Sequence, residues 1–499
     1  MRSPLSRTLT RLLGTLVPPW SYRRRQFLKL AALASGGLAV SNCTAPKAPA
    51  SIAVVGAGLA GLHAAFHLQK QGLVPTVYEG RSRWGGRVHT QTWGNETPLD
   101  LGAVLVNSDH TDVQNLCQEL GVSLYERRGI PNLEDVLFFL GDRRIAMADM
   151  AAALAPLAAQ MATDAQLLAE DFDQYAPALD RLSAAAYLDQ HQAKIRQPFG
   201  RSLLQAVLRS EYGSETTELS SILLLYLLPT VTDSEVEVLS QSDEAYAILG
   251  GSGQLANALA AKLSQPVQFN RTLKTLAREG EGYRLTFADG STATATAVIV
   301  TLPPPALRQV DVTIPLPETL QRYFQEIQLG RNEKQFGRFR KRIWQEAGGF
   351  GDACWSDRTF CTGWDDSVRV GGTEGTFTFF HGGQEVEALR QQSPAVWNQT
   401  LQETLGRLLN RTDLAAQQLP DTLRSTWTTD PFSQGAYTRF APGQVTAFAN
   451  VFYTETSAPI VENLAFAGEH LSAESWGYMN GALETGRLAA LAIAKNLKP

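Results

Sequence analysis

Residues 51–80, SIAVVGAGLAGLHAAFHLQKQGLVPTVYEG, hold the pattern that decides the fold. Residues 51–55 form a short apolar run rich in β-branched side chains, which predicts a buried strand. Three glycines spaced G-x-G-x-x-G follow, and then a helical pattern of apolar residues that ends at Gly72. Residues 74–78 predict a second strand, with Glu79 directly after it. This order of strand, glycine-rich turn, helix and strand predicts the start of a Rossmann-like domain.

Each glycine of the turn has its own physical role. Gly56 permits the tight turn, Gly58 lets a pyrophosphate approach the backbone, and Gly61 lets the helix pack closely on its strand. The N-terminus of the helix offers free N–H groups to the pyrophosphate. Glu79 is placed to accept hydrogen bonds from ribose hydroxyls. The stretch therefore predicts a dinucleotide site.

The next ten residues, RSRWGGRVHT, indicate which dinucleotide is bound. They resemble the second diphosphate motif of the flavin amine oxidase superfamily, which implies FAD. In that resemblance Arg81 and Arg87 neutralise the pyrophosphate, and Gly85 and Gly86 permit its close approach. The alternative is a basic turn on the surface. Three arginines around Gly-Gly, directly after a ribose-binding acid, favour the flavin motif.

Further segments resemble the same family in the same order. LDLGAVLV (residues 99–106) is similar to the segment beneath the flavin, with Ala103 where the family commonly has glycine. After the central Gly-Gly stretch ILGGSGQLANALAAKL, Val267 matches the position whose backbone pairs with adenine. Lys334, in IQLGRNEKQFGRFRKRIW, matches a lysine that holds a water near flavin N5. A plain surface lysine is the alternative for Lys334, because several arginines lie nearby in the sequence.

Two C-terminal segments carry the resemblance into the reacting site. In STWTTDPFSQGAYTRFAPGQ, Trp427 matches the tryptophan beside the flavin, and Tyr437 matches one wall of an aromatic cage. Tyr478 matches the second wall, and Trp476 is expected to line the same pocket. Ala436 stands where mammalian monoamine oxidases have a cysteine bonded to the flavin, so the resemblance implies non-covalent FAD.

The last segment of the resemblance is ENLAFAGEHLSAESWGYMNGALETGRLAALAIAKNL. It implies that Glu469 binds the ribityl chain and that Met479 lies at the flavin. The helix after it, opened by Gly481, would direct its positive end at the flavin pyrimidine edge.

The resemblance implies an α/β fold in which a Rossmann-like FAD-binding domain is assembled from discontinuous segments. An α+β substrate domain with a helical insertion accompanies it, since residues 131–244 are rich in Ala and Leu with helical period. The expected organisation is a signal and linker over residues 1–50, an FAD-binding domain over 51–130, 245–310 and 421–499, and a substrate-binding domain over 131–244 and 311–420.

The activity implied is oxidation of a C–N bond in an L-amino acid, a monoamine or a polyamine, with oxygen or a quinone as electron acceptor. Basic amino acids are among the substrates considered. Venom-type L-amino-acid oxidases hold the substrate carboxylate with an arginine soon after the LDLG segment. This chain has Leu105 and Val106 there, so either another arginine serves or the substrate lacks a carboxylate. C–C desaturases and protoporphyrinogen oxidase are the competing class, and the paired tyrosines disfavour them.

The first 50 residues differ from the rest. They contain six Arg, two Lys and no Asp or Glu, whereas the whole chain of 499 residues has a net charge of −5. An acidic body argues against nucleic acid as a partner. Arg24-Arg25-Gln26-Phe27-Leu28-Lys29 resembles a twin-arginine export signal, which implies the twin-arginine translocase and a periplasmic or other extracytoplasmic location.

Several features of the chain remain open from sequence alone. Cleavage near residues 48–50 is expected, while lipid attachment at Cys43 or an uncleaved tether would keep the protein at a membrane. A homodimer is also open. Cys354 and Cys361 either pair or are buried thiols, and no spacing indicates a metal site.

Overall fold

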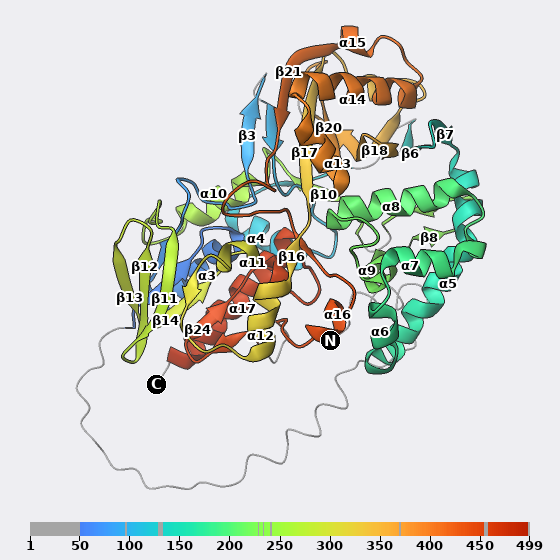
Figure 1. The fold of residues 1–499 in the computed structure, drawn as a ribbon. Coiled ribbons are helices and arrows are strands. Elements are labelled where there is room, and N and C mark those ends of the chain that lie inside the picture. The colour runs from blue at the N-terminus through green and yellow to red at the C-terminus, as the bar shows by residue number, and fades with distance from the viewer. Residues whose placement is uncertain are drawn as a thin grey trace, which may run out of the picture.

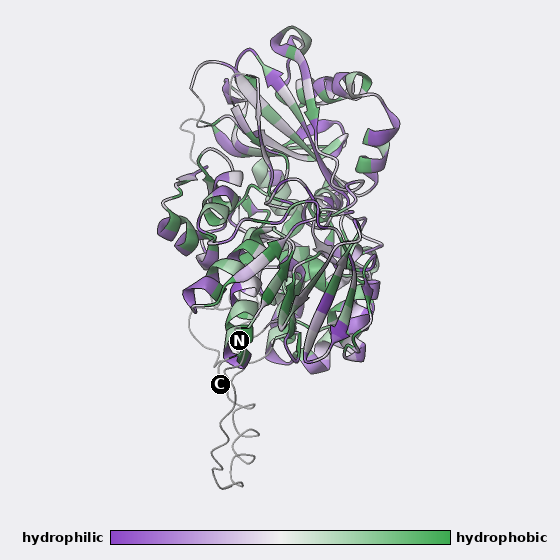
Figure 2. Ribbon diagram, turned by 90° about the vertical axis from the view of Figure 1, so that its left-hand side faces the viewer, coloured by the Kyte–Doolittle hydropathy of each residue, from purple (hydrophilic) through white to green (hydrophobic). Residues whose placement is uncertain are grey.

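The computed structural model describes residues 50–94, 97–127, 133–227, 229–232, 234–239, 242–368, 371–453 and 458–497. The twin-arginine segment and Cys43 lie outside the described residues, so their export and lipid hypotheses stay predictions. Figure 1 shows a large, mostly antiparallel sheet at the top, a parallel sheet with its helices below, and a group of helices to one side. In Figure 2 the hydrophilic colour is prominent on the outer helices, and hydrophobic colour gathers on strands of the lower body.

The parallel sheet is built from strands far apart in the sequence. Its order is β2-β1-β14-β24-β23. β1 (Ile52–Val55) pairs in parallel with both β2 (Pro75–Tyr78) and β14 (Ala297–Val300), and β14 pairs in parallel with β24 (Leu464–Phe466). β23 (Ile460–Val461) closes one edge antiparallel. The predicted α/β fold with a Rossmann-like domain of discontinuous segments is therefore confirmed.

Two helices cross closely beside this sheet. α3 (Leu59–Lys70) packs on α17 (Met479–Leu497). Glycine is needed at the crossing, because a Cβ on Gly486 would lie 2.3 Å from the carbonyl oxygen of Ala60. A Cβ on Gly61 would likewise lie 1.9 Å from the carbonyl oxygen of Gly56. The expected role of Gly61 in close helix–strand packing is thus visible in the structure.

Smaller elements complete this half of the molecule. A four-stranded sheet in the order β13-β12-β11-β15 lies beside the parallel sheet (Figure 1). Its strands are β11 (Leu273–Glu279), β12 (Gly282–Phe287), β13 (Thr292–Ala295) and β15 (Asp311–Val312). The other elements are β3 (Thr90–Trp93), β4 (Thr97–Asp100), α4 (Thr111–Leu120), β5 (Leu124–Glu126), β10 (Tyr246–Ile248), α10 (Gly253–Ala261), α11 (Pro304–Leu307), α12 (Glu318–Glu326), β16 (Gln328–Leu329), β22 (Thr438–Arg439) and α16 (Gln444–Ala447).

The large sheet has seven strands in the order β21-β17-β20-β19-β18-β6-β7. Buried aromatic rings on it pack with leucines of α14 (Pro394–Leu409), and α13 (Gln384–Gln391) joins this layer. Its strands are β6 (Glu134–Leu140), β7 (Arg143–Ile145), β17 (Asn332–Phe339), β18 (Phe350–Arg358), β19 (Phe360–Asp365), β20 (Gly375–Gly382) and β21 (Gln418–Arg424). Cys354 and Cys361 are both free and buried, so the disulfide alternative is wrong and the buried-thiol alternative holds.

The helical insertion is present, but it begins later than the composition predicts. Residues 134–145 form β6 and β7 and belong to the large sheet, because β6 pairs with β18 more than 200 positions away. The helices are α5 (Met147–Glu170), α6 (Phe172–Asp180), α7 (Ala184–Gln190), α8 (Pro198–Tyr212) and α9 (Ser221–Leu227). Within the described ranges, none of the helices combines the length and apolarity needed to cross a membrane.

Candidate active site

A single cavity of about 660 Å³ joins the parallel sheet to the large sheet. Its size falls within the range of small-molecule and cofactor sites. At one end it is lined by residues that follow the carboxyl ends of β1, β2, β14 and β24, where parallel sheets bind ligands. At the other end it is lined by aromatic side chains from the large sheet and the C-terminal segment.

The glycine-rich turn forms a backbone cradle at the first end. Gly56 has φ +103°, and a Cβ there would lie 2.5 Å from Thr301 Oγ1. Gly58 is different, because a Cβ there would meet only the carbonyl oxygen of Gly85, at 4.0 Å. Protein packing therefore does not require glycine at position 58, and the open space in front of it fits the close approach of a ligand phosphate. Gly86, with φ +60°, lies against Gly58.

Glu79 is held rigidly at the same end. It is buried, and its carboxylate accepts hydrogen bonds from the backbone N–H groups of Ala57 and Arg81, each at 2.8 Å. Arg81 itself forms an ion pair with Asp430, including a 2.7 Å hydrogen bond, and donates to Ser433 Oγ at 2.9 Å. The structure thus gives Arg81 a protein partner that the sequence did not indicate.

Val267 does not line the cavity, contrary to expectation. The N–H of the next residue, Gln268, donates to the carbonyl of Val77, and its own carbonyl accepts from Glu79. This segment therefore continues the edge of β2 and turns away from the cavity. The wall at this point is made by Arg271, Thr272, Leu273 and Lys274 instead. Residues 271–274, and not Val267, therefore face the cavity here, and the pairing of Val267 with adenine stays a prediction.

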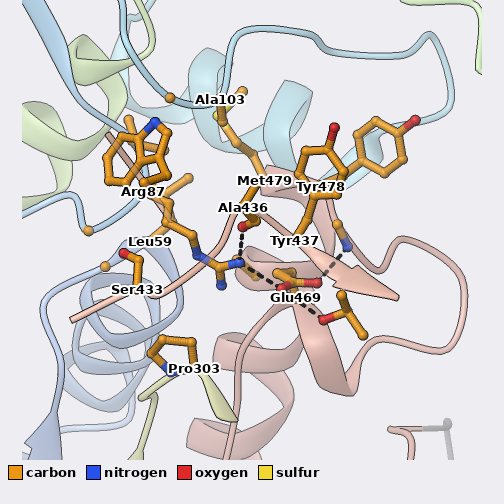
Figure 3. A pocket seen from close by; sticks show the side chains of 18 of the residues that line it. Leu59, Arg87, Ala103, Pro303, Ser433, Ala436, Tyr437, Glu469, Tyr478 and Met479 are labelled. Atoms are coloured by element: carbon orange, nitrogen blue, oxygen red, sulfur yellow. Dashed lines mark hydrogen bonds and ion pairs between the residues drawn. The ribbon is translucent and has the colours of Figure 1, made fainter. Parts of the chain in front are cut away.

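Arg87 and Glu469 form the central ion pair of the site. Arg87 Nη1 lies 2.8 Å from Glu469 Oε1 and also donates to the carbonyl of Ala436 (Figure 3). The same carboxylate accepts from Thr438 Oγ1 at 3.0 Å and from the N–H of Gly477 at 2.6 Å. Burial opposes ionisation of Glu469, but Arg87, His470 and the N–H of Gly477 hold its pKa below the ordinary value.

Two buried side chains, Lys334 and Trp427, hold the 99–106 segment in place through hydrogen bonds to its backbone carbonyls. Lys334 on β17 is only 5% exposed, and its Nζ donates to the carbonyls of Asp100 and Gly102 at 2.9 and 2.7 Å. Burial lowers the pKa of Lys334. Trp427 donates from Nε1 to the carbonyl of Leu101 at 2.7 Å. The surface alternative for Lys334 is therefore wrong, whereas its role toward a water stays a prediction.

The aromatic residues named from the sequence do meet in one place. Tyr437, Tyr478 and Trp476 all line the cavity. Tyr437 donates its hydroxyl to the carbonyl of Ser210, and Tyr478 donates to Ser242 Oγ at 3.0 Å. Figure 3 shows both tyrosines on the side of the cavity away from Leu59 and Ser433.

The C-terminal helix begins at this point. Trp476 packs on Tyr226 with ring centroids 5.3 Å apart. Met479, the first residue of α17, lines the cavity near Ala103 (Figure 3). Gly481 is required in its first turn, because a Cβ there would lie 2.2 Å from the carbonyl oxygen of Ser475. The first turn of α17 therefore packs closely on Ser475, which also lines the cavity.

Several charged or polar residues of the cavity were not found from the sequence. Glu211 and Ser210 come from the last turn of α8, and Arg127 and Glu244 flank the small sheet of β5 and β10. His110 contacts Tyr478 with ring centroids 4.9 Å apart, and burial lowers its pKa to about 4. No local motif marks these residues, because they reach the cavity only through the packing of the helical insertion.

Comparison with known proteins places these features in a family. The model for "flavin containing amine oxidoreductase" matches residues 59–494. Similar curated proteins include a pseudooxynicotine dehydrogenase from a Pseudomonas species, 25% identical over 89% of this chain and 86% of that protein. An L-amino acid dehydrogenase from Synechocystis is 23% identical over 90% of this chain and 96% of that protein.

Solved structures agree on the fold. A cyclohexylamine oxidase from Brevibacterium oxydans aligns with a TM-score of 0.77 at 21% identity, covering 90% of this chain and all of that one. A putrescine oxidase bound to putrescine aligns with a TM-score of 0.75, also at 21% identity, covering 89% and 99%.

Proposed function

The chain belongs to the family of flavin-containing amine oxidoreductases, with FAD as its cofactor, and from this premise we propose that it oxidises a C–N bond of an L-amino acid or an amine. The observation that carries the proposal is one continuous cavity that is lined both by Gly58 and by Tyr437 and Tyr478. One compartment therefore serves both a dinucleotide and a small organic substrate.

The residues of this chain fit FAD. The Gly56–Gly58 backbone and the N-terminus of α3 would receive the pyrophosphate, and the fixed carboxylate of Glu79 would receive ribose hydroxyls. Ala436 offers only a methyl group, so the flavin is held without a covalent bond. When bound, FAD supplies the oxidant that removes two electrons and a hydrogen from the substrate carbon.

The chain's own residues orient the amine and limit its motion. The hydroxyls of Tyr437 and Tyr478 are both tied to other groups, so the two rings form fixed walls for the substrate. The substrate enters as the neutral amine, because the nitrogen lone pair must be available as the α C–H bond breaks. The resulting imine reacts with water to give a carbonyl compound and ammonia.

Arg127 is the residue that we propose binds the carboxylate of an amino-acid substrate. Its side chain is 8% exposed and lines the cavity. Within the described part of the chain it makes one hydrogen bond, from Nη1 to the carbonyl of Glu244 at 3.2 Å, and a loose ion pair with Asp352 at 3.7 Å. The other guanidinium donors suit bidentate binding of a carboxylate. This arginine would replace the one missing near Leu105, which supports an amino acid as substrate.

Anaerobic reduction of the bound flavin tests the proposal directly. The purified holoprotein is mixed without oxygen with L-arginine, L-lysine, aromatic amino acids, monoamines and spermidine, and the flavin absorbance is followed. Bleaching by any of them supports the proposal. Bleaching by a polyene or a porphyrinogen, and by none of the amines, would replace it with the desaturase alternative.

The electron acceptor requires a second measurement. Reoxidation in air with formation of hydrogen peroxide would identify an oxidase. Slow reoxidation in air that a quinone accelerates would identify a dehydrogenase, the activity named for two of the similar proteins. We further propose export through the twin-arginine translocase, which rests on Arg24 and Arg25 in the sequence.

A further inference from the structure

We propose that Glu211 selects substrates that carry a second cationic group, separate from the amine that is oxidised. This inference rests on the proposed amine-oxidising function of the cavity and assigns a substrate class to it. Glu211 lines the cavity from the last turn of α8, beside the wall formed by Tyr478.

The packing of α8 fixes the position of Glu211. A Cβ on Gly382 of β20 would lie 2.0 Å from the carbonyl oxygen of Arg209, so the helix rests directly on the large sheet. The helix then ends at Gly213, which has φ +58° and whose Cβ would lie 2.1 Å from Asn332 Oδ1. Because both sides of the last turn are in close contact with neighbouring residues, the backbone of Glu211 is held in place beside the cavity.

Among the residues that the structure describes, the carboxylate of Glu211 has only hydroxyl partners. Tyr478 Oη lies at 3.4 Å and Ser210 Oγ at 3.5 Å, both at the limit of a hydrogen bond. No Lys, Arg or His of the described residues forms an ion pair with it. Other enclosed carboxylates do have such partners: Glu469 pairs with Arg87, Glu333 with Arg390 and Glu385 with Arg209.

An enclosed carboxylate without a cation is costly to ionise. Burial accordingly raises the pKa of Glu211 to about 7. A cationic group entering the cavity would supply the missing charge and stabilise the ionised form. The reacting amine cannot be that cation, since it must be neutral to be oxidised. The ligand that fits is therefore a molecule with a second ammonium or guanidinium group.

L-Arginine and L-citrulline form a matched test pair, because the ureido group of citrulline has nearly the shape of guanidinium and no charge. Putrescine and butylamine form a second pair that lacks the carboxylate. We expect the wild-type holoenzyme to prefer the dicationic member of the pair that it oxidises. Glu211→Gln should lower this preference in kcat/KM by roughly 10- to 100-fold, while activity on the neutral member changes little.

Glu385→Gln is the control variant. Glu385 is also a buried carboxylate whose pKa burial raises to about 7, but it contacts Cys361 and Arg209 and does not line the cavity. We expect its variant to keep the wild-type preference. Glu211→Asp retains the charge and should keep part of the preference, which guards against a fold defect specific to the glutamine variant.

A binding measurement separates this inference from the proposed function. α-Methyl-L-arginine and α-methyl-L-citrulline lack the α C–H bond, so perturbation of the flavin spectrum reports their binding without turnover. Tighter binding of the arginine analogue by wild type, lost in Glu211→Gln, supports the inference even if no amine reduces the flavin. An unchanged preference in Glu211→Gln, or an equal loss for both members of a pair, overturns it.

Discussion

At the scale of single residues, the aromatic end of the cavity holds opposite charges that the protein compensates incompletely. Within the described ranges, Glu211 has hydroxyl partners alone, and Arg127 meets Asp352 only at 3.7 Å. Lys334, by contrast, donates two hydrogen bonds to backbone carbonyls. A zwitterionic substrate with a further cation would compensate the charges of both Glu211 and Arg127. The two residues together therefore restrict the substrate class more than either residue does alone.

The ionisation of Glu211 predicts a pH-dependent substrate preference. The carboxyl group has its pKa raised to about 7, so it is protonated below that pH and ionised above it. A cation binds the ionised form, and the ratio of kcat/KM for L-arginine to that for L-citrulline should therefore rise with pH and level off above about pH 8. At pH 6 the ratio should be about tenfold below its plateau.

The ratio of the two kcat/KM values cancels the pH effect of every group that acts on both substrates alike, including the α-amines of the substrates. His110 contributes nothing in this window, since its pKa is lowered to about 4. Steady-state assays from pH 5.5 to 9 would measure the effect. A ratio that stays flat in wild type, or one that still rises in Glu211→Gln, would contradict the assignment.

Arg127→Gln tests the carboxylate contact. Agmatine is arginine without its carboxylate, so it needs no partner at Arg127. We expect the variant to lose roughly 10- to 100-fold in kcat/KM on L-arginine, because a charge-assisted bidentate contact is removed, and to keep its activity on agmatine. Equal losses on the two compounds would show that Arg127 supports the fold of the cavity wall and does not bind substrate.

At the scale of elements, the glycine-rich turn over residues 56–61 serves two functions at different glycines: cofactor approach at Gly58 and helix packing at Gly61. Gly58→Ala should leave the fold intact, because the new Cβ meets nothing closer than 4.0 Å and φ is already −71°. It should weaken FAD binding about 10- to 100-fold by filling the phosphate approach. Gly61→Ala should instead destabilise the apoprotein by about 1–3 kcal/mol, since its Cβ would lie 1.9 Å from the Gly56 carbonyl.

Urea unfolding of the two apoproteins and FAD titration of the refolded chains would distinguish these effects. Gly61→Ala should show a lower unfolding midpoint, and Gly58→Ala a normal midpoint with a raised dissociation constant. A normal FAD affinity in Gly58→Ala would mean that the open space in front of residue 58 is not used by the cofactor.

Elements that depend on local sequence could be predicted, and those set by distant partners could not. The turn over residues 56–61 and the helix after it follow from spacing alone, because the glycines and apolar positions lie within one supersecondary unit. β6 was missed since its strand conformation comes from pairing with β18. Val267 was expected at the cavity but does not line it, because register along an edge segment depends on the neighbouring strand.

The same limit applies to side chains in the candidate site. Glu79 and Glu469 were identified because each follows a strand of the dinucleotide fold in a recognisable motif. Asp430 and Glu211 carry no such local signal. Asp430 becomes relevant only through its ion pair with Arg81, 349 positions away in the sequence, and Glu211 only through the packing of α8 on β20.

At the scale of the whole molecule, the cofactor site exists only once distant parts of the chain have joined. β1, β14 and β24 are neighbours in one sheet although they begin at residues 52, 297 and 464. Arg87 and Glu469 meet across the same assembly. With alanine at position 436, no covalent bond would retain the flavin if the chain were unfolded for transport. A protein of this kind reaches an extracytoplasmic compartment with its flavin only if it is transported folded.

If Arg24 and Arg25 form the proposed twin-arginine signal, replacing both with lysine should leave flavin-loaded protein in the cytoplasm. Cell fractionation, with immunoblotting for the chain and flavin absorbance for the cofactor, would measure the distribution. Arg23→Lys is the matched control, because Arg23 adjoins the pair without belonging to the motif and its loss should leave export unchanged. Export of the double variant at the wild-type level would show that the segment is not read as a twin-arginine signal. Exported protein without flavin would show instead that transport does not require a bound cofactor, and the argument from discontinuous assembly would then fail.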